Sequence, residues 1–127
     1  MGKKGIVRIL RGDIVLVPFK FSDLSNTKFR PVLVISENKG NKNKGCEDFT
    51  ALQITSNIEK NAPYLVMVDP AVYPETNLRS LSAVNVSNIQ RLEKSFVRAN
   101  IGKMPHDLME EIDKYLISSL GIKNKSA

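Results

Sequence analysis

The sequence predicts a single β-rich α+β domain, in which a small barrel of short strands precedes one C-terminal helix. Three observations lead to this prediction. Short apolar runs rich in β-branched residues recur along most of the chain, and polar loops separate them. Near residue 105 the apolar residues begin to recur at steps of three and four, which indicates a helix. At 127 residues the chain has the length of one domain.

The apolar runs predict the strands in order. The expected strands are Ile6–Leu10, Ile14–Phe19, Pro31–Glu37, Phe49–Ser56, Tyr64–Val68, Val84–Val86 and Ile89–Leu92. We interpret Gly12-Asp13 as a turn and the start of the second of these strands. Asn, Lys and Gly fill the segment Asn38–Gly45, and this composition is typical of a loop. A long connection with two prolines leads from Asp69 to Ser80.

The predicted helix runs from Pro105 to Leu120, with Leu108, Ile112 and Leu116 on its apolar face. Pro105 suits the first turn of a helix, and Gly121 suits the position just after its end. We expect residues 1–121 to form the domain and residues 122–127 to be a frayed tail.

The net charge is +6, and most of it lies in the first half of the chain. Residues 1–60 contain 11 Lys and Arg against 6 Asp and Glu, whereas residues 61–127 contain 8 against 7. A basic half can attract phosphate or an acidic protein partner, or it can serve solubility alone.

The composition also argues against several classes of protein. No apolar run approaches the roughly 18–20 residues of a membrane helix, and charges interrupt the N-terminal apolar segment where a signal peptide would need a core. The single cysteine, Cys46, can form neither an internal disulfide nor a metal cluster. We therefore expect a cytoplasmic protein. No metal or cofactor motif is present, so we expect no cofactor.

Two polar segments are predicted to meet at one end of the sheet. Arg30 precedes Pro31 at the entrance of one strand, and Thr55-Ser56-Asn57 ends the next. If Glu37 pairs near Phe49, then Pro31 lies opposite Thr55. Arg30 would thus lie beside Thr55 and Ser56.

This corner has the chemistry to hold a phosphodiester. A guanidinium offers a planar fork of donors to phosphate oxygens, and hydroxyls can position a phosphate or relay a proton. Lys20 and Lys28, in the loop before Arg30, add positive potential. The residue types alone also fit a simple surface arrangement, in which Arg, Ser and Thr cap strand ends.

The segment from Gly12 to Ser36 resembles the opening of the MazF/PemK family of toxin ribonucleases. In that family a Gly-Asp-Ile/Val strand, a polar loop and an Arg-Pro-Val-Leu-Val-Ile strand follow in this order, as they do here. The resemblance implies an SH3-like small β-barrel with a C-terminal helix. It implies that Arg30 and Thr55, the latter within LQITSN, form the catalytic pair.

The resemblance further implies metal-independent cleavage of single-stranded mRNA by attack of the ribose 2′-hydroxyl. It also implies a homodimer and a cognate antitoxin with an acidic segment. Lys20, Asp23, Lys28, Ser56 and Asn57 are the expected nucleic-acid-binding residues. Asp23 is also a candidate general base, although we favour a turn-forming role for it.

Two departures from the family pattern stand out. Some members carry an Arg-x-Asp pair before the last barrel strand and a histidine in the first loop, whereas here SAVNVSNIQ lacks both charges and the only histidine is His106. Two alternatives therefore stay open. One is a CcdB-like gyrase-binding toxin, which the absence of tryptophan disfavours; the other is a plain nucleic-acid-binding barrel.

Overall fold

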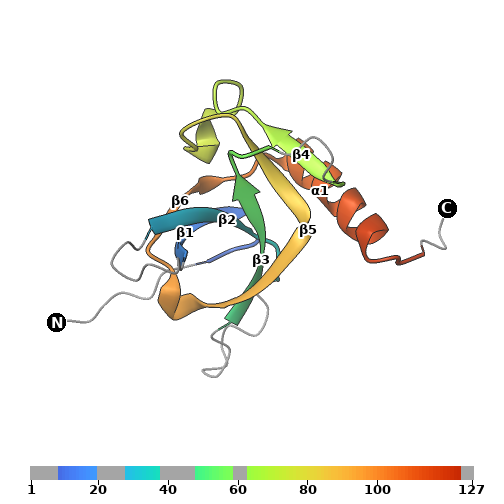
Figure 1. Cartoon of the computed structure of the whole chain (residues 1–127), viewed down its shortest axis with the longest axis horizontal. Helices are drawn as coiled ribbons and strands as arrows, with labels where there is room; N and C mark the ends of the chain where they lie inside the picture. The colour runs from blue at the N-terminus through green and yellow to red at the C-terminus, as the bar shows by residue number, and fades with distance from the viewer. Residues whose placement is uncertain (1–8, 20–27, 38–47, 59–62, 124–127) are drawn as a thin grey trace.

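The computed structural model describes residues 9–19, 28–37, 48–58 and 63–123. Its strands are β1 (Asp13–Phe19), β2 (Lys28–Val34), β3 (Asp48–Thr55), β4 (Leu65–Val68), β5 (Ser82–Glu93) and β6 (Ala99–Lys103). Two short 3-10 helices, η1 (Pro74–Thr76) and η2 (Lys94–Phe96), flank β5, and α1 (His106–Ser119) follows β6. Figure 1 shows a strongly curled sheet with α1 beside one of its faces.

The strands form one six-stranded sheet in the order β4-β5-β3-β2-β1-β6. All neighbouring strands are antiparallel. The curl brings the two ends of the sheet round into a half-barrel (Figure 1). The predicted class, a β-rich α+β domain with a C-terminal helix, is therefore confirmed.

Both faces of the central strands are buried. On the face toward α1, which we call the helix face, Ile14, Leu33 and Leu52 pack in one cluster with Ile112 of the helix. On the opposite face, which we call the barrel face, a second cluster includes Val15, Val17, Val32, Val34 and Phe49. This double burial explains why these strands have continuous apolar runs rather than an alternating pattern.

The predicted pairing of β2 with β3 was wrong by one residue. The structure pairs Val32 with Gln53, Leu33 with Leu52 and Val34 with Ala51. Extending this pairing places Arg30, rather than Pro31, level with Thr55. A polar face and an apolar face on a strand normally select one register. Here both faces are apolar, so the sequence pattern fits a register shifted by one residue almost equally well.

The predicted strand boundaries needed further corrections. The strand expected at Pro31–Glu37 begins and ends three residues earlier, so Lys28 and Arg30 lie within β2 and not in the loop before it. Val84–Val86 and Ile89–Leu92 belong to one strand, β5, whose pairing with β3 shifts register between Leu52 and Gln53. The sequence did not predict β6, because ANIGK contains Asn and Gly and has low strand propensity. The expected strand Ile6–Leu10 lies mostly outside the described residues, and its last two residues are not in a strand.

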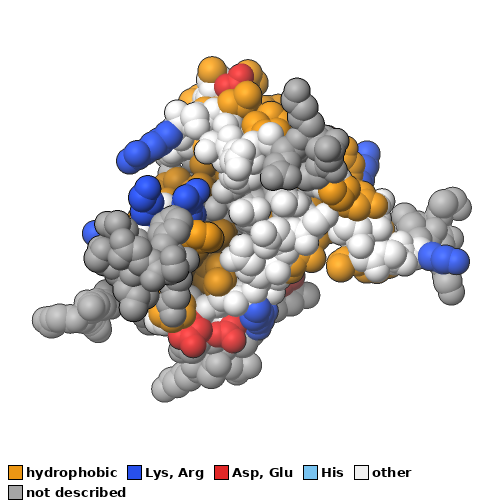
Figure 2. All heavy atoms as spheres, in the orientation of Figure 1, with side chains coloured by type: hydrophobic (Ala, Val, Ile, Leu, Met, Phe, Trp, Pro, Cys, Tyr) orange, Lys and Arg blue, Asp and Glu red, His pale blue; other side chains and the backbone are white. Residues whose placement is uncertain are grey.

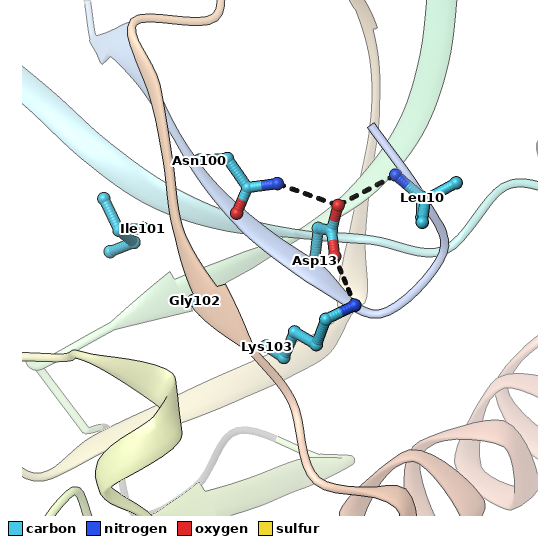
Figure 3. A pocket seen from close by; sticks show the side chains of 6 residues that line it. All are labelled: Leu10, Asp13, Asn100, Ile101, Gly102 and Lys103. Carbon is cyan, nitrogen blue, oxygen red and sulfur yellow. Dashed lines mark hydrogen bonds and ion pairs between the residues drawn. The ribbon is translucent and has the colours of Figure 1, made fainter. Parts of the chain in front are cut away.

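Asp13 joins the first strand to the last. The residue is 3% exposed, and Oδ2 accepts hydrogen bonds from the backbone N–H of Leu10 (2.9 Å) and Nδ2 of Asn100 (2.8 Å). Lys103 Nζ lies 3.4 Å from Oδ1 (Figure 3). Gly12, with φ of 96°, forms the turn just before Asp13, as expected. These contacts hold β6 beside β1, where the ladder shifts register between Ile14 and Val15.

The predicted helix is confirmed with close boundaries. Pro105 is its N-cap residue, and Gly121, with φ of 72°, follows its end. The Tyr73 hydroxyl donates a hydrogen bond to Asp107 (3.1 Å), and this bond raises the pKa of the tyrosine above its ordinary value. The contact joins the long connection before β5 to the first turn of α1. Among the described helices, α1 included, none has the length and apolar content needed to span a bilayer.

Candidate functional site

A groove of about 670 Å³ opens where the ends of β2 and β3 meet the segment before β5 and the start of β6. Its lining residues are Leu16, Lys28, Phe29, Arg30, Pro31, Ile54, Ser56, Asn77, Leu78, Arg79, Ser80, Ser82, Arg98 and Ile101. The floor is apolar, with Leu16, Pro31 and Ile54, and the other lining side chains are mostly polar. Lys and Arg side chains gather on this side of the molecule, at the left of Figure 2.

The charged side chains that line the groove are all positive. They are Lys28, Arg30, Arg79 and Arg98, and neither Asp nor Glu is among the lining residues. Like charges from three separate segments raise the electrostatic potential inside a concave surface. The groove is therefore suited to a polyanion such as a phosphodiester chain.

Arg30 lies on β2 opposite Val17, and its side chain is exposed. The guanidinium carbon is 5.3 Å from the centre of the Phe19 ring, within the range of a cation–π contact. Phe19 is itself 45% exposed. The aromatic ring thus limits where the long Arg30 side chain can go and leaves the charge at the surface.

Thr55 lies on the same face of the sheet as Arg30. Residues paired across antiparallel strands share a face, and so do residues two apart along one strand. Since Val32 pairs with Gln53, Arg30 and Thr55 both project from the barrel face. The floor residues Pro31 and Ile54 alternate with them and project from the helix face, so Arg30 reaches the groove at its rim. The Thr55 hydroxyl accepts a hydrogen bond from the backbone N–H of Asn57 (3.0 Å), which fixes its position at the strand end.

The structure brings together three of the predicted site residues, because Lys28, Arg30 and Ser56 all line the groove. Thr55 and Asn57 are next to Ser56 in the chain but are not lining residues. Lys20 and Asp23 lie outside the described residues.

Two groove arginines escaped the sequence analysis. Arg79 precedes β5, and Arg98 precedes β6, where its guanidinium carbon lies 5.2 Å from the centre of the Phe29 ring. Both belong to the half of the chain whose charge is nearly balanced, so composition gave no sign of them. The basic character of the site therefore comes from both halves of the chain.

Among the described residues, no group of three His, Cys, Asp or Glu side chains comes close enough together to hold a metal ion. His106 lies at the start of α1, where Nε2 is 3.3 Å from a Glu110 oxygen, and it does not line the groove.

A sequence profile of a family described as "PemK-like, MazF-like toxin of type II toxin-antitoxin system" matches residues 10–120. The chain belongs to this family. The match covers the whole sheet and α1, so the resemblance seen between Gly12 and Ser36 extends over the entire PemK/MazF-like domain.

Solved structures share the fold over nearly the whole chain. An endoribonuclease in complex with its cognate antitoxin from a mycobacterial species is 23% identical, with a TM-score of 0.68, over 92% of this chain and 99% of that one. MazE–MazF from Deinococcus radiodurans is 22% identical, with a TM-score of 0.70, over 91% and 98%. The Mycobacterium tuberculosis toxin MazF-mt6 is 18% identical, with a TM-score of 0.69, over 88% and 99%. No curated protein matches the chain significantly.

Proposed function

We propose that this PemK/MazF-like chain is a toxin endoribonuclease that cleaves single-stranded mRNA in the cytoplasm without a metal ion. The observation that carries the proposal is the groove with four cations and no acidic side chain, which reaches Arg30 at its edge. Family membership supplies the reaction class, and the related endoribonuclease and MazE–MazF structures support it.

The proposed reaction is an internal transfer at phosphorus. The ribose 2′-oxygen forms a bond to the adjacent phosphorus while the bond from phosphorus to the 5′-oxygen breaks. The 2′-hydroxyl proton leaves to a base, and the 5′-oxygen gains a proton. The products are a 2′,3′-cyclic phosphate and a 5′-hydroxyl end.

Arg30 is the proposed stabiliser of the transition state, in which negative charge on the nonbridging oxygens increases. A guanidinium can meet two such oxygens at once, and preorganised donors of this kind account for a large part of enzymatic rate enhancement. Thr55, on the same face at the end of the neighbouring strand, is proposed to position the phosphate or relay a proton. A guanidinium is too weak an acid to act alone as the proton donor.

We also propose a homodimer and an antitoxin whose acidic segment competes with RNA for the groove. Carboxylates placed among Lys28, Arg30, Arg79 and Arg98 would match the charge of the site. This part of the proposal predicts that an acidic antitoxin peptide and RNA exclude each other from the protein.

The decisive experiment compares a ribose strand with one that carries a single deoxyribose at the cut site. We expect the protein, in EDTA, to cleave the ribose strand and to bind the deoxyribose strand without cutting it, because the nucleophile is missing. Binding of both strands without any cleavage would identify a plain nucleic-acid-binding barrel instead. A stable gyrase complex with no RNA products would identify the CcdB-like alternative.

Arg98→Gln is expected to weaken RNA binding through phosphate contacts alone. For a single strand, each lost phosphate contact should reduce the magnitude of the negative slope of log affinity against log salt by roughly 0.7. We would measure the slope by fluorescence anisotropy with the uncut deoxyribose strand. The matched control is Arg91→Gln on β5, since Arg91 donates to Thr50 Oγ1 (2.8 Å) and does not line the groove. Equal slopes for the two variants would contradict the assignment of the groove.

A further inference from the structure

The barrel face carries a row of amide side chains beside the predicted catalytic pair. Gln53 lies two residues before Thr55 on β3, and Asn85 lies opposite Gln53 on β5. Asn88 also lies close to Gln53. The pairing of β3 with β5 shifts register there, since Leu52 pairs with Ile89 and Gln53 with Asn85, which leaves Asn88 among the extra residues of β5. In Figure 2 an uncharged region runs over β3 and β5 beside the Lys and Arg side chains.

Hydrogen bonds fix the orientation of this amide cluster, which we define as Gln53, Asn85 and Asn88. The backbone N–H of Ser87 can only donate, and it donates to Asn85 Oδ1 (3.1 Å). Asn85 must therefore turn its Nδ2 toward Gln53, whose Oε1 lies 3.5 Å away. Asn88 Nδ2 donates to the same oxygen at 3.2 Å. Gln53 thus uses its oxygen within the cluster and directs its Nε2 elsewhere.

The Nε2 group of Gln53 is available to an external acceptor. Within the described part of the chain it donates to no protein atom, and it is not a buried atom without a partner. Gln53 is half-buried, and this nitrogen therefore keeps some accessible surface. The Asn88 oxygen accepts a hydrogen bond from Gln90 Nε2 (3.2 Å), as the Asn85 oxygen does from Ser87. Asn85 and Asn88 each retain a second amide proton, so the cluster presents mainly donors.

We propose that the amide cluster reads the base next to the scissile phosphate and selects one with a carbonyl oxygen at O4 or O6, uracil or guanine, where cytosine and adenine carry an amino group. Sequence-specific recognition of single-stranded RNA depends on hydrogen bonds to splayed bases, and amides are suited to this contact. Two residues along a strand span about 7 Å, so a nucleotide with its phosphate at Thr55 can place its base over Gln53. The inference rests on the proposed function and adds the determinant of sequence preference.

The role of the cluster differs from that of the groove. Contacts to phosphate position a strand without regard to sequence, whereas contacts to base edges specify it. The four groove cations supply the first kind, and the uncharged amides supply the second. Substitutions in the two sets should therefore have separable effects.

The test uses Gln53→Glu, which keeps an oxygen for Asn85 and Asn88 but replaces the free donor by an acceptor. We expect the preference for uracil or guanine at one position to fall about five- to tenfold and to move toward adenine or cytosine, the loss of about one hydrogen bond. Sequencing of RNA ends from a random pool measures the preference. Gln53→Met, which adds no charge, should lose the preference without acquiring a new one.

Arg91→Met is the control, because Arg91 also lies on β5 but donates to Thr50 Oγ1 (2.8 Å) and makes no hydrogen bond with the amide cluster. It should retain the wild-type preference. A wild-type cut-site preference that survives in both Gln53 variants would overturn the inference, and so would an equal loss in Arg91→Met. The relative affinity for short uridine and adenosine homopolymers measures the same selectivity without cleavage. If the wild type binds uridine tighter and cuts nothing, the proposed function fails while the base selectivity stands.

Discussion

Arg30→Ala is expected to slow cleavage of single-stranded RNA about a hundred- to a thousandfold. The loss of one preorganised donor to a developing oxyanion has effects of this size. Arg30 is exposed and contacts the Phe19 ring from one side, so we expect its removal to cost no more than about 1 kcal/mol of stability. Single-turnover rates with saturating protein would measure the chemical step apart from binding.

Two further variants define what the guanidinium contributes. Arg30→Lys keeps the charge but loses the two-pronged geometry, so its rate should fall between those of wild type and Arg30→Ala. Arg91→Ala removes an exposed arginine outside the groove and should cleave at the wild-type rate. Affinity for the uncut deoxyribose strand should fall only a few-fold in Arg30→Ala, because the other groove cations remain. Undiminished cleavage by this variant would refute the catalytic assignment.

Gly102→Ala is expected to destabilise the domain by about 3 kcal/mol, the upper end of the range for overpacking. A Cβ at Gly102 would lie 2.5 Å from the Thr76 carbonyl oxygen and 2.6 Å from that of Glu75. Both obstacles are backbone atoms, which cannot turn aside as a flexible side chain could. Thermal unfolding should show a fall in Tm of roughly 10 °C for a domain of this size.

The close approach at Gly102 also supports the groove. It holds η1 against β6, and Asn77, just after η1, donates a side-chain hydrogen bond to the Ile101 carbonyl. Since residues 77–80 form one wall of the groove, Gly102→Ala should also lower RNA affinity at temperatures where the variant is still folded. Gly121→Ala is the control. Its added Cβ meets no atom, so only the positive φ opposes it, at about 1 kcal/mol, and RNA affinity should not change. Equal destabilisation by the two variants would contradict the steric explanation.

The parts of the fold that follow from neighbouring residues could be predicted. β1, β3 and β4 coincide closely with the predicted runs, whereas β2 lies three residues before its run. The helix α1 lies within the range that its apolar spacing and Pro105 indicated. Arg30 could be selected as a site residue for the same reason, because the motif around Pro31 is contiguous. Such signals depend on the conformational preferences of short segments, and these are already present in the unfolded chain.

The parts that depend on distant pairing could not be predicted. β6 has weak propensity and forms because β1 offers it a partner and Asp13 binds Asn100 beside it. The predicted register between β2 and β3 was also wrong. Apolar residues lie on both faces of these strands, so the sequence has no alternation of polar and apolar residues that would fix the register.

The candidate site shows the same division. The order of residues along the chain, together with the family resemblance, was enough to propose Arg30, Lys28 and the polar end of β3 as a phosphate-binding corner. Arg79 and Arg98 join them only because the sheet curls and the chain before β5 packs against β6. The amide cluster likewise depends on the register shift between β3 and β5, which the local sequence pattern does not predict. Local preference acts between neighbours in sequence, whereas a charged groove is a property of surfaces that meet after folding.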